Sequence, residues 1–240
     1  MPEQIITNKQ NLKFYSEKPY EYNWDKEPGE KNPFMYKFFV PLAHIILNKK
    51  FDMEFYGAEN VPTDRPLLLA SNHVAGIDPI AITYCLTKSG TMKTMYFMAK
   101  EEFFHTFYTK IPLLVFGGFP VKRGTSDRNS LNYSIKVLKN GHRLLVFPEG
   151  TRNLERTKPT EGKAGIALIA REAKVDILPI SIYRSKTVEG KKDKYIIRFN
   201  EVIPYEELGL GDKPKSKELR SATELIMEKI GESWEIDAEK

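Results

Sequence analysis

The sequence lacks the features that mark disulfide-stabilised and membrane-spanning proteins. Its 240 residues contain one cysteine, Cys85, which excludes an internal disulfide and indicates a reducing compartment. The longest apolar run near the N-terminus, Phe38 to Leu47, is interrupted by Pro41 and His44. It falls well short of the ~20 residues that cross a bilayer. No secretory signal is visible either, so we expect a protein without a transmembrane span.

Several cofactor motifs are also missing. The chain has no cluster of cysteines and histidines at metal-ligand spacing, no Gly-Lys-Ser/Thr phosphate loop and no Gly-x-Gly-x-x-Gly turn. Cys85 lies inside an apolar segment and is interpreted as a core residue rather than a nucleophile. The sequence therefore implies neither a metal nor a nucleotide cofactor.

What the sequence does carry is an excess of positive charge. Lysine and arginine number 37 against 32 aspartate and glutamate residues, which gives a net charge of +5 and a pI near 9.0. Such a balance favours an anionic partner, namely nucleic acid, a membrane surface or a phosphorylated substrate. Aromatic residues interleaved with a basic groove, as single-strand nucleic-acid binding needs, are not evident around Arg123 or Arg152. We therefore predict no nucleic-acid partner.

The alternation of apolar and amphipathic segments predicts the fold. From Phe51 onward, strand-length apolar segments alternate with helix-length segments. This order predicts an α/β fold with a mixed, largely buried sheet flanked by helices. The predicted strands cover 53–56, 67–70, 95–98, 118–121, 143–147, 177–182 and 195–199. The predicted helices cover 79–87, 101–108, 127–139, 164–172 and 216–230.

Residues 1–51 are predicted to form a helical, aromatic-rich segment that docks on a membrane, ahead of an α/β domain over 52–240. Asn32-Pro33 predicts a helix start, and the helix that follows has a narrow polar stripe beside a wide apolar surface. This pattern is typical of a helix that lies in a membrane interface, with its cations toward anionic lipid. A mostly buried helix in a soluble core is the alternative. The predicted docking residues are Phe34, Lys37, Phe38, Phe39, Leu42, Ile45, Ile46, Lys49 and Lys50.

The stretch Asn72-His73-Val74-Ala75-Gly76-Ile77-Asp78-Pro79 places an imidazole and a carboxylate in one turn between a strand and a helix. An aspartate held against one ring nitrogen fixes the tautomer of a histidine and leaves the other nitrogen as a base. Gly76 would allow backbone angles that bring Asp78 beneath the ring. Two plainer interpretations compete with this one. Asp78 could serve only as the helix cap before Pro79, and His73 could be an ordinary packed or solvated residue.

Two other predicted strands end in basic turns. One segment runs Gly117-Gly118-Phe119-Pro120-Val121-Lys122-Arg123-Gly124, and the other runs Phe147-Pro148-Glu149-Gly150-Thr151-Arg152. The planar fork of arginine suits phosphate recognition, and a neighbouring glycine lets the backbone come close to a ligand. Each arginine taken alone could also be an ordinary solvated charge.

Taken in order, these segments resemble the four-motif signature of the glycerolipid acyltransferases. The resemblance rests on Asn72-His73 with Asp78, on Gly117 with Arg123, on the turn 147–152, and on Ile177-Leu178-Pro179-Ile180. It is closest to the bacterial 1-acyl-sn-glycerol-3-phosphate acyltransferases and runs from about Val61 to Ile203. Ala99-Lys100-Glu101 and Gly162-Lys163-x-Gly165 are secondary similarities. The third motif of the family usually continues with serine, where this chain has Asn153.

The resemblance implies a role for each matched residue. His73 would be the general base on the free hydroxyl of a lysophospholipid, with Asp78 as its orienting partner. The residues implied to hold the glycerol phosphate are Glu149, Gly150, Thr151 and Arg152, with added positive charge from Lys100 and Arg123. The residues implied to line an acyl channel are Ile177, Leu178, Pro179 and Ile180.

The reaction implied by the resemblance is transfer of a fatty acyl group from an acyl thioester to the sn-2 hydroxyl of lysophosphatidate, forming phosphatidate. The donor would be acyl-ACP or acyl-CoA, and the enzyme would be peripheral on the cytoplasmic face of the membrane. The chain contains no Gly-x-Ser-x-Gly elbow, which favours direct attack by the acceptor over an acyl-enzyme. Alternatives are an acyltransferase for another head group, a thioesterase or lysophospholipid hydrolase using the same base, and a non-catalytic lipid-binding module.

Overall fold

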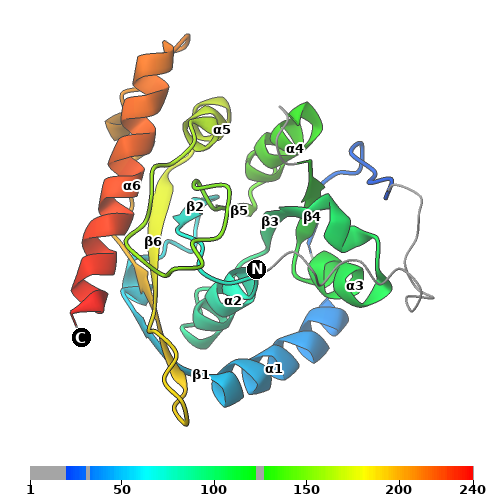
Figure 1. Cartoon of the computed structure of the whole chain (residues 1–240). Coiled ribbons are helices and arrows are strands. Elements are labelled where there is room, and N and C mark those ends of the chain that lie inside the picture. Colours follow the sequence, from blue (N-terminus) through cyan, green and yellow to red (C-terminus); the bar gives the residue numbers. More distant parts are fainter. Residues whose placement is uncertain (1–19, 31–32, 123–126, 240) are drawn as a thin grey trace.

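The computed structural model describes residues 20–30, 33–122 and 127–239, with side chains of helix α1 described from residue 37. Seven strands form one sheet in the order β1-β7-β6-β2-β5-β3-β4 (Figure 1). The pair β6–β7 is antiparallel, and the other neighbouring pairs are parallel. The strands are β1 (Phe51–Tyr56), β2 (Leu68–Ser71), β3 (Met95–Lys100), β4 (Gly118–Val121), β5 (Arg143–Val146), β6 (Ile177–Arg184) and β7 (Asp193–Phe199).

Helices cover both faces of this sheet (Figure 1). One face packs against α1 (Pro33–Lys50), α2 (Asp78–Lys88) and α3 (Phe107–Val115), and the other packs against α4 (Arg128–Lys139), α5 (Gly165–Ala173) and α6 (Ser216–Ala238). Successive side chains of a strand point to opposite faces. In β2, Leu69 accordingly enters the first core, whereas Leu68 and Ala70 enter the second. The sheet is therefore buried on both sides, as its apolar strands require.

The predicted mixed α/β fold is confirmed. Every predicted strand overlaps an observed strand, and the predicted ends differ from the observed ends by at most two residues. The helices predicted over 79–87, 127–139 and 164–172 correspond to α2, α4 and α5. Because β2, β5, β3 and β4 run parallel, the segments that follow them leave the sheet at one edge.

Two helix predictions are wrong. The segment 101–108 is not one helix, because Glu101–Phe104 forms a 3₁₀ turn and Thr106 adopts extended backbone angles before α3 begins at Phe107. Helix α6 does not end before Gly231 but continues to Ala238. A Cβ atom on Gly231 would lie 3.3 Å from Cε of Lys158. This glycine therefore makes room for the loop between β5 and α5 and does not terminate the helix.

Helix α1 makes polar contacts with α2 on its inner side and exposes several apolar side chains on its outer side. The His44 ring lies edge-on to Tyr84 of α2 at a centroid distance of 4.5 Å, and Asn48 Oδ1 accepts a hydrogen bond from the Tyr84 hydroxyl at 3.2 Å. Phe39 is half-buried, and Val40 and Leu47 enter the core. The exposed apolar side chains are Phe38, Leu42, Ile45 and Ile46. Within the described ranges, no helix has both the length and the apolar character needed to cross a membrane.

Candidate active site

The turn after β2 buries polar side chains at the carboxyl edge of the sheet. Asn72 is 1% exposed, His73 8% and Asp78 0%. Strand β6 holds Asn72 through two hydrogen bonds, because Nδ2 donates to the Ile182 carbonyl at 2.8 Å and Oδ1 accepts from the Ile182 N–H at 2.7 Å. This amide pairing extends the contact between β2 and β6 by one residue and fixes where the next side chain, His73, leaves the sheet.

His73 and Asp78 form a hydrogen-bonded pair inside the turn. The distance from His73 Nδ1 to Asp78 Oδ2 is 2.6 Å. The same oxygen accepts hydrogen bonds from the backbone N–H groups of Val74 at 2.7 Å and Ala75 at 3.0 Å. An ionised carboxylate only accepts, so Nδ1 is the nitrogen that donates, and in the neutral imidazole the lone pair is on Nε2. The imidazole also stacks on the Phe147 ring at a centroid distance of 4.0 Å, which fixes its plane.

The helix-cap interpretation of Asp78 is wrong. Helix α2 begins at Asp78 itself with Ile77 in the N-cap position, and no side chain caps its first turn. The carboxylate points back toward the turn and toward the hydroxyl of Tyr195 on β7. The expectation of unusual backbone angles at Gly76 is also wrong, because Gly76 is not among the glycines with positive φ. A Cβ atom there would lie 3.5 Å from Nη1 of Arg152, an ordinary van der Waals distance, so Gly76 marks where the arginine lies over the turn.

Glu149 connects the His73 turn to the loop between β5 and α5. Its Oε1 accepts a hydrogen bond from the backbone N–H of His73 at 3.0 Å, and its Oε2 accepts from the Thr160 hydroxyl at 2.8 Å. The backbone N–H of Asn153 also donates to the His73 carbonyl at 2.7 Å. Glu149, one of the residues implied to hold the glycerol phosphate, thus ties the loop between β5 and α5 to the His73 turn. A buried carboxylate in that position positions the loop and does not itself attract phosphate.

Two cavities that share a wall meet beside His73. The first, about 350 Å³, is lined by His73, Lys122, Thr151 and Lys163 together with apolar side chains of β3 and β5. The second, about 380 Å³, is mostly apolar and extends between α4 and α5. The residues common to both cavities are Met98, Val121, Val146, Phe147, Gly150 and Lys163. A polar, cationic space thus continues into an apolar one at the carboxyl edge of the sheet, where α/β folds bind ligands.

The cations at and near the first cavity follow two strands, β4 and β5. Lys122 follows β4, while Arg152 and Lys163 lie on the loop between β5 and α5. Gly150 has φ +72°, and a Cβ atom there would come within 2.8 Å of Lys163 Nζ. Gly150 therefore serves a left-handed turn and a close approach by the lysine. Lys122 and Lys163 were not among the residues predicted to bind phosphate, although both stand inside the quoted motifs.

Two of the sequence predictions concern residues that lie away from these cavities, and a third concerns a residue that the structure does not describe. Lys100 does not line either cavity, and its Nζ pairs with Glu102 Oε1 at 2.9 Å. Arg123 lies outside the described residues. The residues implied to line an acyl channel are buried in the middle of the sheet and line neither cavity; they are Ile177, Leu178, Pro179 and Ile180. Their apolar run reflects a strand covered on both faces.

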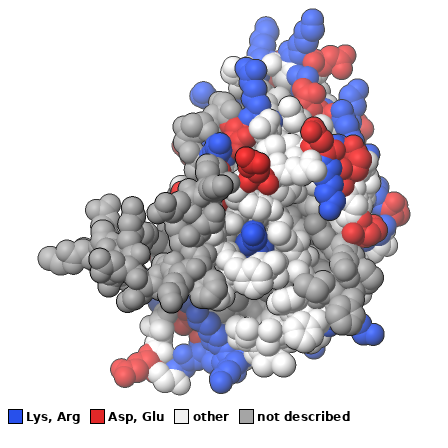
Figure 2. All heavy atoms as spheres, turned by 90° about the vertical axis from the view of Figure 1, so that its right-hand side faces the viewer, with Lys and Arg blue, Asp and Glu red and all other residues white. Residues whose placement is uncertain are grey.

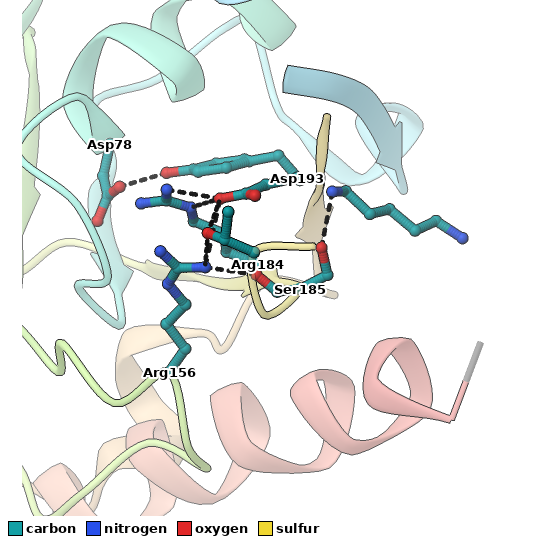
Figure 3. A network of polar contacts seen from close by, with 8 residues as sticks. Asp78, Arg156, Arg184, Ser185 and Asp193 are labelled. Carbon is teal, nitrogen blue, oxygen red and sulfur yellow. Dashed lines mark hydrogen bonds and ion pairs between the residues drawn. The ribbon is translucent and has the colours of Figure 1, made fainter. Parts of the chain in front are cut away.

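A polar network anchors the far side of the loop between β5 and α5 (Figure 3). Asp193 Oδ2 accepts hydrogen bonds from Nε and Nη2 of Arg184 at 2.8 and 2.6 Å and from Nη1 of Arg156 at 3.3 Å. Burial alone would raise the pKa of Asp193, but the hydrogen bonds from Arg184 and Thr187 outweigh it and hold the pKa below its ordinary value. Arg156 belongs to the loop of Arg152, so the base of the β6–β7 hairpin fixes the loop from outside.

The arrangement can accept a proton from a hydroxyl group beside an anion site. Among the described residues no partner is found for Nε2 of His73, while the other ring nitrogen is held by a buried carboxylate. Cations border the same cavity, and an apolar cavity adjoins it. Cys85 lies elsewhere, within α2, where burial raises the pKa of its thiol. A nucleophilic role for this cysteine is therefore not supported.

Comparisons with known proteins point to one family. The family model described as Acyltransferase matches residues 52–183, more than half of the chain. A 1-acyl-sn-glycerol-3-phosphate acyltransferase of Bacillus subtilis (strain 168) is 27% identical over 200 residues, which cover 82% of this chain and 96% of that protein. A second, from Streptococcus pneumoniae (strain ATCC BAA-255 / R6), is 29% identical over 172 residues, which cover 70% of this chain and 62% of that protein.

A solved structure shares the fold. The crystal structure of the 1-acyl-sn-glycerophosphate (LPA) acyltransferase PlsC from Thermotoga maritima superposes with a TM-score of 0.63 at 24% identity. The likeness covers 85% of this chain and 80% of that chain. At this identity it supports the mixed α/β architecture and not the details of the site.

Proposed function

Because the chain belongs to the acyltransferase family and is an acyltransferase, we propose that it transfers a fatty acyl group to the sn-2 hydroxyl of 1-acyl-sn-glycerol-3-phosphate. The relatives that bear this activity in their names support the substrate class. The observation that carries the proposal is the pair of His73 and Asp78 at the wall of a cavity that is cationic at one end and continues into an apolar space.

In the proposed reaction, Nε2 of His73 removes the proton from the acceptor hydroxyl as its oxygen attacks the thioester carbonyl. The carbon–sulfur bond then breaks, and the imidazolium returns the proton to the leaving thiolate. Asp78 holds the ring and stabilises the imidazolium that forms between the two steps. A positioned base of this kind typically contributes ~10²–10⁴ in rate.

The acceptor phosphate would bind to the cations at the loop between β5 and α5. Arg152 lies over Gly76 in the His73 turn, and Lys163 and Lys122 border the cavity that His73 lines. Arg123 stays a predicted contributor on the sequence alone. Arginine binds phosphate through two parallel N–H donors, and lysine adds a point charge. The phosphate is three bonds from the sn-2 carbon, so one cavity can hold both the cations and the reacting hydroxyl.

The apolar cavity between α4 and α5 is the proposed site for an acyl chain. Its walls come from Val146 of β5, Leu131 of α4, and Ile166 and Ile169 of α5. It joins the cavity of His73 along a shared wall. This placement replaces the channel expected along β6, whose side chains are packed in the core.

We also propose that the outer face of α1 docks on the bilayer. Phe38 and Ile45 are 64% and 65% exposed, and Phe107 and Tyr108 on the neighbouring helix α3 are exposed too. Lys49 and Lys50 end α1, and Nζ of Lys192 in the β6–β7 hairpin donates to the Asn48 carbonyl at 2.7 Å. Figure 2 shows a mostly uncharged area on the side of α3, with Lys and Arg at both the upper and the lower end of this view; Figure 1 has α1 at the lower end.

Apolar surface flanked by cations is the pattern of an anionic membrane interface. Such docking would bring the active site to the leaflet that holds its lipid substrates. The cytoplasmic face, the peripheral attachment and the donor, acyl-ACP or acyl-CoA, are parts of the proposal that rest on the sequence.

The test is incubation with labelled acyl thioester and vesicles that contain lysophosphatidate, followed by lipid analysis. Parallel arms would use acyl-CoA or acyl-ACP, lyso-lipids with other head groups, and donor without acceptor. We expect label at the sn-2 position of phosphatidate and little thioester loss without acceptor. Equal thioester loss without acceptor would indicate a hydrolase, and preference for another lyso-lipid would reassign the acceptor.

A further inference from the structure

The hydroxyl of Tyr195 completes the set of donors around Asp78. Tyr195 lies on β7, outside the matched residues 52–183, and is fully buried. Its hydroxyl donates to Oδ1 of Asp78, the oxygen that does not face His73. Oδ2 meanwhile accepts from His73 and from the backbone N–H groups of Val74 and Ala75. Both oxygens of the carboxylate therefore have fixed donors.

We propose that Tyr195 is a positioning residue for the reaction, acting on His73 through Asp78. The inference rests on the proposed role of His73 and adds a residue that none of the four sequence motifs contains. A carboxylate with donors only on Oδ2 could rotate about its terminal torsion, and the hydroxyl on Oδ1 holds its plane. Tyr195 also draws negative charge away from Oδ2 and so tunes how strongly Asp78 accepts the Nδ1 proton.

The surroundings of Tyr195 keep its hydroxyl group protonated, so that it donates a hydrogen bond. Burial raises the pKa of its hydroxyl well above the ordinary value, and the charge of Asp78 raises it further. The ring is itself held by packing, with the Phe51 ring at a centroid distance of 5.0 Å. Arg184 of β6 is the cross-strand neighbour of Tyr195, and its partner Asp193 begins the strand that carries Tyr195. The β6–β7 hairpin that holds the loop of Arg152 therefore also carries Tyr195, the hydrogen-bond donor to Asp78 behind His73.

The decisive variant is Tyr195→Phe, which keeps the ring and removes the hydroxyl. We expect kcat to fall about tenfold, a loss that corresponds to ~1.4 kcal/mol of activation free energy, while KM for both substrates stays unchanged. The matched control is Tyr96→Phe. Tyr96 is also buried, and its hydroxyl donates to the Gly29 carbonyl at 2.7 Å, away from the dyad. Tyr195→Phe loses the hydrogen bond to Asp78, and Tyr96→Phe loses two hydrogen bonds with the Gly29 backbone, so a general effect on stability would appear at least as strongly in the control.

The proton on Nδ1 of His73 gives a second readout that needs no substrate. Without the Tyr195 donor, Asp78 Oδ2 becomes a stronger acceptor, so the far-downfield proton resonance of this hydrogen bond should move further downfield. Replacement of Tyr195 by 3-fluorotyrosine, a more acidic donor, should move it upfield in a protein of unchanged shape.

If Tyr195→Phe and Tyr96→Phe lose the same share of kcat, or if the resonance stays in place in both Tyr195 variants, the inference fails. If the resonance moves but the wild-type protein does not acylate lysophosphatidate, the proposed function fails alone.

Discussion

The turn after β2 and the helix α1 depart in opposite directions from the rule that polar side chains face water and apolar side chains lie inside. The turn buries Asn72, His73 and Asp78, whereas α1 exposes Phe38 and Ile45. Burying polar groups is unfavourable unless each finds a partner, and the turn provides partners from β6, β7 and its own backbone. Nothing in the described part of the chain covers the outer face of α1.

The difference between these regions indicates what each is for. The turn is complete within the fold, and in our proposal it serves chemistry that requires a fixed geometry. The face of α1 is completed only by something outside the described fold, which in our proposal is a bilayer. Substitutions in the turn should therefore act on turnover, and substitutions on α1 should act on lipid binding. The predictions below test that separation.

The largest effect is expected from Asp78→Asn. The amide carries no charge to stabilise the imidazolium, so kcat should fall by ~10³, within the usual range for a disabled base. Steady-state acylation assays would measure the change, with Asp64→Asn on an exposed loop as the control. A variant that keeps a third of the wild-type kcat would show that the pair does not act in turnover.

Arg152→Ala should act mainly on the acceptor. Loss of a charge-assisted hydrogen bond to phosphate typically costs ~1.5–3 kcal/mol, so KM for lysophosphatidate should rise by roughly 10–100-fold. Arg65→Ala is the matched control, because Arg65 is an exposed arginine paired with Asp176 at 3.1 Å. A rise in donor KM with unchanged acceptor KM would place Arg152 at the thioester and not at the phosphate.

The double variant Phe38→Asp/Ile45→Asp should lower binding to anionic vesicles at least about tenfold, because full burial of each side chain is worth ~1.5–3 kcal/mol. Sedimentation with vesicles would measure the loss. Ile236→Asp is the control, since Ile236 is an exposed apolar residue of α6 on the opposite side of the sheet. Turnover on a monomeric short-chain acceptor should be preserved. Unchanged vesicle binding in a folded double variant would refute docking by α1.

The smallest effect on turnover, with a clear effect on stability, is expected from Asp193→Asn. The pKa of Asp193 is lowered in the folded protein, so its contribution is present above the ordinary aspartate pKa near 4 and is lost as the pH falls through the folded value. Urea unfolding at pH 6 should show a loss of about 1–3 kcal/mol for the variant. The gap between variant and wild type should shrink as the pH is lowered below about 4. A gap that stays constant over this range would mean that the carboxylate charge is not what stabilises the hairpin base.

Much of the fold followed from local pattern. The apolar run around Leu68 and Leu69 predicts a strand covered on both faces, and Pro33 predicts the start of α1 within a residue. The helix assignment failed at Thr106, which is extended, and at Gly231, which stays inside helix α6. Local pattern is also ambiguous at Ile177–Ile180, where an apolar strand suits a channel wall and a sheet core equally well.

The site was predictable where one short segment holds both partners. His73 and Asp78 lie in one turn, so their spacing and flanking residues indicated the pair. Glu149 could be found by its motif but not assigned to bracing, because its partner Thr160 is brought to it only by the loop. Tyr195 gave no signal, since it meets Asp78 across 117 residues of sequence. Contacts of that kind depend on sheet order and not on spacing.

The most direct test of the account compares His73→Ala with His142→Ala in single-turnover acylation of lysophosphatidate. His142 is a good control because its ring also lies beside a carboxylate, 3.8 Å from Glu30, and packs against Tyr96 near the amino ends of the strands. We predict that His73→Ala loses ~10²–10⁴ in rate, that His142→Ala keeps the wild-type rate, and that both remain folded. A folded His73→Ala variant that transfers the acyl group at the wild-type rate would contradict the account.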